Sequence, residues 1–264
     1  FFLTFAWAFP SLPGEKPPYR LLQLFASVML LFAVVWPQYI FLSVPGLPRV
    51  NPFTLGSFLF LSAVAILMLH YRAFSAQLFD SLRSVRALVV VYTIWMVWRV
   101  ATSAMVDFPV SRILEILREF IFIHSAFWVA LILSGKTGWK RSMVGLLIFA
   151  TFVVALAGIA EAVEQRNRFV AFASGDEDGQ LGAVIAGIAE EKLRMGKFRV
   201  QSVFGHPILF GQFLGAVIPL LLMALMLKKG FFWRSAICVV GVLCLIGIWK
   251  SGSRSGVLAS VVSV

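Results

Sequence analysis

The residues of this sequence with the most distinctive chemistry are arginines at the edges of apolar segments. Arg254 lies between two serine–glycine pairs in the stretch SGSRSG, and Arg199 precedes His206 at the start of another apolar run. An arginine side chain presents a planar fork of N–H donors that binds phosphate oxygens in pairs. Small neighbours such as Ser253 leave room for such a group. The pattern is typical of a site for an anionic ligand, with Arg254, Ser253 and Arg199 as its first candidates.

Three further residues are candidates for the same site: His206, Lys250 and Arg99. Arg99 lies inside an apolar run, where a charged residue costs about 2.5–3.5 kcal/mol on insertion and usually faces a cavity or a partner. A simpler interpretation stays open for the arginines, because a boundary arginine can extend its side chain to lipid headgroups. His206 can equally be an ordinary histidine at the start of a helix.

Other familiar kinds of catalytic site have no motif in this sequence. It contains no GxxxxGK[ST] phosphate loop, no HExxH pair and no CxxC pair. The acidic run at 176–178 is typical of a solvated loop, so we predict neither a metal site nor a cofactor. Cys238 and Cys244 lie in one apolar run, and they indicate no disulfide framework.

The composition indicates an integral membrane protein. Of the 264 residues, 60% are hydrophobic and only 13% are charged, whereas soluble domains carry about 25% charged residues. The net charge of +11 could suggest a nucleic-acid partner. However, the basic residues fall in short clusters between apolar runs, which is how membrane topology is encoded. We therefore predict that the protein contacts membrane lipids and that it has no nucleic-acid partner.

The apolar runs predict a helical bundle. A membrane helix needs about 20 mostly apolar residues, and seven runs meet or approach this length. They cover 21–44, 53–70, 87–106, 120–133, 142–162, 207–227 and 235–249. An eighth run starts at Val257, and Pro37 is expected to kink the first. The predicted fold class is all-α: a polytopic transmembrane helical bundle of about seven complete spans and the start of an eighth, in one membrane domain over 1–264.

The loops between these runs predict an orientation. The loops after the second, fourth and sixth runs are basic: Arg72, Arg83, Arg86, Lys136, Lys140, Arg141, Lys228, Lys229 and Arg234. By the positive-inside rule these loops and the N-terminus are cytoplasmic. The loops at 107–119 and 163–206 and the turn that carries Arg254 then face outward. Within the long outer loop, 180–195 has apolar residues at helical spacing, so we expect an amphipathic helix on the membrane or on the bundle. Glycines at 205, 211 and 215 are expected to allow close backbone approach.

Two stretches together resemble a known family. FRVQSVFGHPILFGQFLGAVIPL (198–220) is followed, after one more helix, by SGSRSGVLAS (251–260). Their order and common outer side are similar to the O-antigen ligase and O-antigen polymerase superfamily of bacterial envelope enzymes. The residues that match the family's two elements are Arg199, Phe204, His206 and Pro207 in the first, and Ser253, Arg254 and Ser255 in the second.

The resemblance implies an activity and a location. Members of the superfamily are multi-pass glycosyltransferases of the bacterial inner membrane that serve lipopolysaccharide and polysaccharide biosynthesis. They transfer a glycan from an undecaprenyl-diphosphate carrier to an acceptor hydroxyl on a lipid, a saccharide or a protein at the periplasmic face. They need neither a nucleotide sugar nor a metal. The family's arginine that matches Arg254 holds the donor diphosphate, and we expect the same role here.

The sequence also departs from the family pattern. The family has a second arginine and a general-base histidine in a large periplasmic loop nearer the C-terminus, and His206 does not occupy the position of that histidine. The chain begins with Phe1 and reaches Val264 before such a loop. We therefore expect 1–264 to be a fragment that lacks the catalytic base and is inactive by itself. A transporter of small anions and a non-catalytic scaffold for envelope assembly stay open as alternatives.

The predicted orientation can be tested by thiol labelling. In intact cells, Thr137→Cys and Gly230→Cys should be shielded from an impermeant thiol reagent, whereas Asp178→Cys should label, because only the last lies in a loop predicted to face outward. Labelling at 137 together with protection at 178 would reverse the orientation and remove Arg254 from the outer side.

Overall fold

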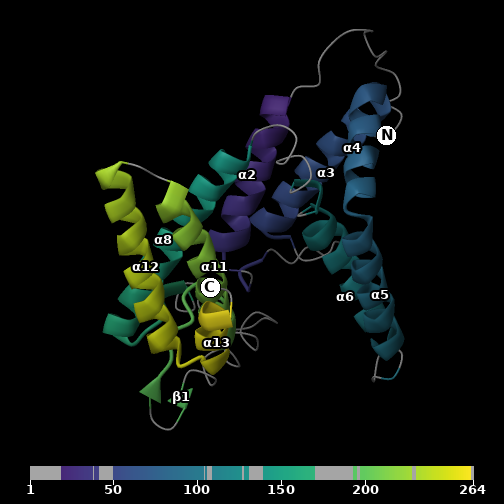
Figure 1. The fold of residues 1–264 in the computed structure, drawn as a ribbon. Helices are drawn as coiled ribbons and strands as arrows, with labels where there is room; N and C mark the ends of the chain where they lie inside the picture. The colour runs from purple at the N-terminus through teal and green to yellow at the C-terminus, as the bar shows by residue number, and fades with distance from the viewer. Residues whose placement is uncertain are drawn as a thin grey trace. The chain divides into compact units, whose positions relative to one another are not determined.

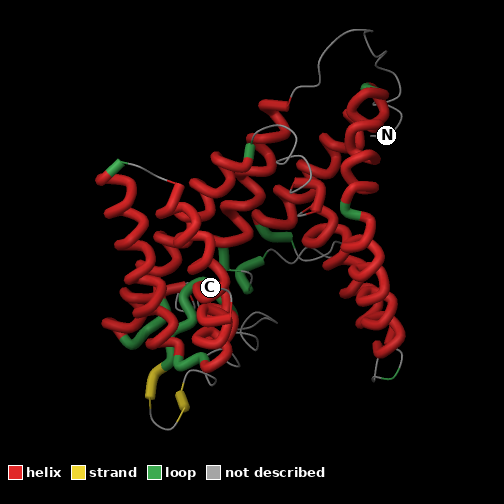
Figure 2. Tube along the Cα trace, in the orientation of Figure 1, coloured by secondary structure: helices red, strands yellow, loops and turns green. Residues whose placement is uncertain are grey.

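The described part of the chain is helical and divides into two compact units. The computed structural model describes residues 19–37, 39–41, 50–103, 105, 109–126, 128–130, 139–169, 193–194, 197–227 and 230–262. Within these ranges the only strands form one short hairpin (Figure 2). Unit 1 comprises Phe1–Met29 and Pro52–Met143, and unit 2 comprises Leu30–Asn51 and Val144–Val264. Each unit is described by itself.

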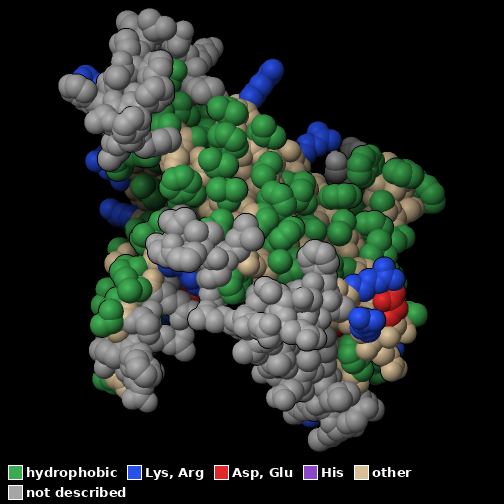
Figure 3. Space-filling view, turned by 180° about the vertical axis from the view of Figure 1, so that it is seen from behind, with side chains coloured by type: hydrophobic (Ala, Val, Ile, Leu, Met, Phe, Trp, Pro, Cys, Tyr) green, Lys and Arg blue, Asp and Glu red, His purple; other side chains and the backbone are tan. Residues whose placement is uncertain are grey.

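Four helices are long and apolar enough to cross a membrane. They are α3 (Pro52–His70), α8 (Lys140–Glu164), α11 (Pro207–Leu227) and α12 (Phe231–Ser251). A fifth span is added if α4 (Arg72–Ser84) and α5 (Arg86–Ser103), which meet at a bend of 78°, count as one. On the face shown in Figure 3, hydrophobic side chains cover much of the described surface. The described residues thus form an all-helical, multi-pass membrane protein with four to five long apolar helices; the expected total of about seven complete spans is not confirmed.

The first helix is shorter than the apolar run that predicted it. α2 extends over Tyr19–Val35, whereas the sequence indicated a span over 21–44. The helix ends just before Pro37. A proline disfavours helical conformation in the residue before it and cannot donate the next helical hydrogen bond. Pro37 therefore lies beyond the helix instead of kinking it.

In unit 1, α3 buries one face along its whole length. Phe53, Phe60 and Leu67 on this face are buried, at the spacing of every second helical turn. Gly56 faces α2, and a Cβ at this position would lie 3.4 Å from the Cα of Met29, which is ordinary contact. The α3 helix therefore packs on α2 through a small residue.

The segment expected to be a basic loop after α3 is instead the helix α4. Phe74, Leu78 and Ser81 are buried on one side of α4, while Arg83 is exposed. The Tyr19 hydroxyl donates to Gln77 Oε1 over 2.8 Å and ties α4 to α2. The buried residues recur three and four positions apart, which is the spacing of one face of an amphipathic helix. The loop prediction was wrong because it considered only the charges.

A second expected loop, at 107–119, contains the helix α6 (Pro109–Glu119). A π-helical turn, η1 (Phe120–Ser125), follows it directly, so the fourth expected span does not begin as a regular α-helix. Arg99 Nη1 lies 2.8 Å from Glu119 Oε2, which joins α5 to the end of α6. Residues 127 and 131–133 of that expected span lie outside the described residues.

In unit 2, the ring of Phe210 on α11 is central to the core. A Cβ at Gly158 of α8 would lie 2.6 Å from Phe210 Cζ, and a Cβ at Gly247 of α12 would lie 3.2 Å from the same atom. The two glycines therefore provide the space that the ring fills. Pro207 begins α11, where its missing N–H has no helical partner to lose. Figure 1 shows α11 beside α12.

The helix α13 (Arg254–Val262) packs on α11 through glycines. A Cβ at Gly256 would lie 2.6 Å from the carbonyl oxygen of Gly211, and a Cβ at Gly215 would lie 2.5 Å from the carbonyl oxygen of Gly256. The expected close approach at positions 211 and 215 is confirmed. At Gly205 the nearest atom would be 3.9 Å away, which is ordinary contact. The helix that corresponds to the expected eighth run begins at Arg254, three residues earlier than expected.

The end of the long outer loop forms a hairpin of two short strands, β1 (Leu193–Arg194) and β2 (Lys197–Phe198). The amphipathic helix expected over 180–195 is therefore wrong at 193–194. Residues 170–192 and 195–196, including the acidic run at 176–178, lie outside the described residues. The hairpin leads directly into the segment 199–206 before α11.

The glycine contact between α11 and α13 can be tested by Gly256→Ala. The added methyl group meets the backbone of α11, which cannot move aside as a flexible side chain would, and overpacking of this kind typically costs about 1–3 kcal/mol. The midpoint of thermal unfolding in detergent should fall accordingly.

Gly241→Ala in α12 is the matched control, since its Cβ would have no atom within 4 Å. A glycine-to-alanine change in an open helix position is favourable by up to about 1 kcal/mol. Equal midpoints for the two variants would contradict the close contact.

Candidate functional site

The turn between α12 and α13 depends on a glycine in a left-handed conformation. Gly252 has φ 61° and ψ 23°, and its N–H donates to the carbonyl oxygen of Trp249 over 3.1 Å. Side chains rarely tolerate this conformation, whereas glycine adopts it readily at the end of a helix. The chain therefore ends one helix and begins the next within two residues, and Arg254 becomes the first residue of α13.

Ser253 caps α13. Its Oγ accepts a hydrogen bond from the Gly256 N–H over 3.1 Å and lies 3.0 Å from Ser255 Oγ. A serine at this position satisfies one of the open N–H groups in the first turn. Ser253 is buried, whereas Arg254 is exposed. The exposed arginine thus lies at a helix N-terminus, where the backbone itself favours negative charge.

The segment before α11 lies against this turn. Arg199 is buried, and its Nε donates to the carbonyl oxygen of Ser251 over 2.9 Å. The next residue, Val200, donates its N–H to the carbonyl oxygen of Lys250 over 3.3 Å. Of the predicted site residues, Arg199, Lys250, Ser253 and Arg254 therefore surround one turn. The two sequence stretches that suggested an anion site meet in space although about fifty residues separate them.

The other side of the same segment is attached to α8 through Glu161. This carboxylate is buried, and its Oε2 accepts the N–H of Gln201 over 3.3 Å and the N–H of Ser202 over 2.6 Å. Ser202 Oγ donates to the carbonyl oxygen of Val154 over 2.8 Å. The carbonyl oxygen of Ser202 accepts from Asn167 Nδ2, also over 2.8 Å. The segment 199–202 is therefore hydrogen-bonded to α12 on one side and to α8 and the residues after it on the other.

Four polar residues of this network were not predicted from the sequence: Glu161, Gln201, Ser202 and Asn167. A signal for Glu161 was present, since a carboxylate at the end of an apolar run is costly to bury and usually has partners. No comparable signal marked the others, because their role comes from backbone contacts with residues distant in sequence.

Tyr39 is a further buried polar residue of unit 2. It follows the end of α2, and its ring lies beside Gly205. Its hydroxyl has no hydrogen-bond partner among the described residues. Burial, and then the nearby negative charge of Glu161, raise the pKa of the Tyr39 phenol. Tyr39 is therefore a neutral hydroxyl at neutral pH.

His206 is the N-cap of α11. Its Nδ1 accepts the N–H of Ile208 over 3.0 Å, which is the bond that a capping side chain makes in the first turn. This geometry matches the simpler of the two interpretations of His206 from the sequence. The nitrogen that accepts this bond is occupied in fixing the start of the helix.

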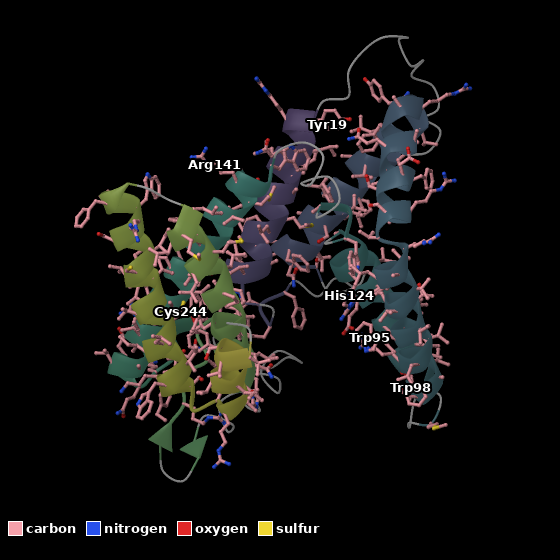
Figure 4. All side chains as sticks on the ribbon, in the orientation of Figure 1. Tyr19, Trp95, Trp98, His124, Arg141 and Cys244 are labelled. Carbon is pink, nitrogen blue, oxygen red and sulfur yellow. The ribbon has the colours of Figure 1, made fainter. Side chains whose placement is uncertain are left out.

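Arg99 has a separate environment in unit 1. Besides its ion pair with Glu119, its guanidinium carbon lies 5.1 Å from the ring centre of Trp95. The Trp95 ring in turn lies 5.8 Å from that of His124, and both are labelled in Figure 4. These contacts account for the presence of a charge in an apolar run, since a cation there needs a charged or aromatic partner.

The described residues contain no group of three His, Cys, Asp or Glu side chains that could hold a metal ion. The groups gathered at the α12–α13 turn are instead positively charged. They are two arginines, one lysine and a helix N-terminus, which suits an anionic group such as a phosphate.

Comparisons with protein-family models, with curated proteins and with solved structures find no match for this chain. The resemblance described from the sequence therefore depends on the residues of the two stretches.

The capping role of Ser253 can be measured with Ser253→Ala. Loss of an N-cap hydroxyl costs about 1 kcal/mol of stability, so the midpoint of thermal unfolding should fall. Ser260→Ala is the control, because Ser260 Oγ donates to the carbonyl oxygen of Val257 within the same helix and does not cap it. An effect of the control as large as that of Ser253→Ala would contradict the capping role.

Proposed function

We propose that this chain is part of a membrane glycosyltransferase of the O-antigen ligase or polymerase type. Its donor is a glycan linked to undecaprenyl diphosphate, and its acceptor is a hydroxyl group on a lipid or a saccharide. The observation that supports this proposal most is the hydrogen bond from Arg199 to Ser251. Through it, the two stretches that resemble the family lie at one turn.

The transfer needs stabilisation of a growing negative charge. The bond between the anomeric carbon of the glycan and the phosphate oxygen breaks, and its electron pair stays on the diphosphate. A new bond forms between the anomeric carbon and the acceptor oxygen, whose proton passes to a base. Preorganised cations aimed at the leaving group are the means by which proteins lower such a barrier.

Each residue of the turn has a part in this proposal. Arg254, exposed at the N-terminus of α13, binds the diphosphate with its fork of donors. Ser253 caps the helix and so fixes the residue that follows it. Arg199 and Lys250 add positive charge, and Arg199 also holds the segment before α11 to the turn.

The proposed reaction places the turn at the periplasmic surface of the bacterial inner membrane. The donor's isoprenoid chain lies in the lipid and its diphosphate at the boundary, which is where a cation at the end of a span can reach it. The residues proposed here for the turn bind the diphosphate without a metal or a cofactor.

Arg254→Ala tests the proposal in the full-length protein. Removal of one preorganised donor to a developing negative charge typically lowers a rate about a hundred- to a thousandfold. Glycan transfer should fall by that factor, and carrier-linked glycan should accumulate, with abundance in the membrane unchanged. Arg254→Lys should restore only part of the rate, because a point charge does not reproduce bidentate binding.

Arg234→Ala is the matched control, since Arg234 is exposed in the first turn of α12 and Arg254 follows the other end of the same helix. It should transfer glycan at nearly the normal rate. Normal transfer by a well-expressed Arg254→Ala protein would contradict the diphosphate role and favour a scaffold or an anion transporter.

A further inference from the structure

We propose that Glu161 is a positioning residue that holds the segment 199–202 in place, and with it Arg199. The functional part of this inference rests on the proposed glycan transfer; the structural part does not. Glu161 itself contacts neither the turn nor the proposed ligand site through the hydrogen bonds described above. Its effect passes through the backbone of Gln201 and Ser202.

The burial of Glu161 makes its hydrogen bonds strong. The side chain is 4% exposed, and removing a carboxylate from water is unfavourable unless donors replace the water. The N–H groups of Gln201 and Ser202 are such donors. Hydrogen bonds to an ionised group are about twice as strong as bonds between neutral groups. The segment and the carboxylate therefore stabilise each other.

The backbone of Ser202 needs this support. Its φ is 54°, in the left-handed region that a residue with a side chain adopts at a cost of about 1–3 kcal/mol. Three of its groups are bonded to surrounding residues: the N–H to Glu161, the hydroxyl to Val154 and the carbonyl oxygen to Asn167. Such a conformation persists only where the surroundings hold it, and Glu161 is the one charged group among these partners.

The link from Glu161 to Arg199 is short. Gln201, which donates to Glu161, is two residues from Arg199, and Val200 between them donates to Lys250. A shift of the Gln201 and Ser202 backbone therefore reaches Arg199 and its bond to Ser251 without an intervening flexible stretch. A misplacement of about 1 Å in a binding group can lower a rate about a hundredfold.

The same helix offers a matched control. Glu164 lies three residues after Glu161 on α8, but it is paired with Arg168 in an ion pair whose arginine is exposed. Replacing either glutamate removes one carboxylate from the last turns of α8. Only the replacement of Glu161 removes partners of the segment 199–202.

The experiment measures the exposure of Val203, the residue that directly follows the segment 199–202, without any assay of activity. Val203→Cys places a thiol at a side chain that is 3% exposed, in a protein whose exposed Cys238 has been replaced by Ser. The full-length protein in detergent is treated with a water-soluble maleimide. The native Cys244, fully buried in α12, reports in the same sample whether unit 2 stays folded.

We expect the introduced thiol to react slowly in the parent and in Glu164→Ala. In Glu161→Ala it should react at least about tenfold faster while Cys244 stays protected, because opening that is about 1.4 kcal/mol easier exposes the site tenfold more often. Glu161→Gln keeps an acceptor oxygen, so its labelling rate should lie between those of the parent and Glu161→Ala. If Glu161→Ala also exposes Cys244, the comparison is made with Glu161→Gln. Labelling no faster than in Glu164→Ala would overturn the inference.

Glycan transfer by the same variants separates this inference from the proposed function. Glu161→Ala should lose transfer about a hundredfold, Glu161→Gln should recover part of it, and Glu164→Ala should be nearly normal. Faster labelling with undiminished transfer, in a protein that Arg254→Ala inactivates, would remove the positioning role and leave the proposed function intact. Normal transfer by Arg254→Ala would remove the proposed function, while the labelling result would still decide whether Glu161 holds the segment.

Discussion

The contact on which the rest of unit 2 depends is the seating of the α12–α13 turn on Gly211 of α11. A Cβ at Gly211 would lie 2.6 Å from the Cβ of Ser253 and 2.7 Å from the Oγ of Ser251. Only a residue without a side chain leaves room for the turn. In a membrane, helices associate through close packing and hydrogen bonds because lipid is as apolar as their side chains. A larger residue here would displace Ser253, and with it the start of α13.

Non-helical backbone in an apolar bundle needs partners for every polar group. The segment 199–202 finds several of these partners on two sides, through α12 and through Glu161 on α8. The arrangement explains why charged and polar residues are buried in a unit that is otherwise apolar. The position of Arg199 therefore depends on both α8 and α12, since each helix supplies only some of the hydrogen-bond partners of the segment.

The two units differ in how they accommodate an arginine. In unit 1, Arg99 is neutralised by Glu119 and covered by the ring of Trp95. In unit 2, Arg199 donates to the carbonyl oxygen of Ser251 at the α12–α13 turn, and the exposed Arg254 follows that turn. The exposed position of Arg254 at the N-terminus of α13 is the physical reason to propose the anion site at the α12–α13 turn instead of at Arg99.

Much of the architecture follows from the sequence alone. The low charge and the long apolar runs require helices in a membrane, because only there are the side chains and the backbone both satisfied. α11 occupies the range predicted for it, 207–227. α3 begins at Pro52, one residue before the start of its own predicted range. The segments between apolar runs were predicted to be loops where α4 and α6 are helices, since hydropathy and charge were considered without periodicity.

The site depends on tertiary structure in a way that no local pattern could express. The sequence identified Arg199, Ser253 and Arg254 as chemically suited to an anion, because side-chain chemistry and flanking small residues are local properties. Arg199 donates to Ser251, and Glu161 accepts from the segment 199–202. Both contacts depend on which backbones approach closely in the folded chain. Those approaches arise from glycines on separate helices, and hydropathy describes each helix without its neighbour.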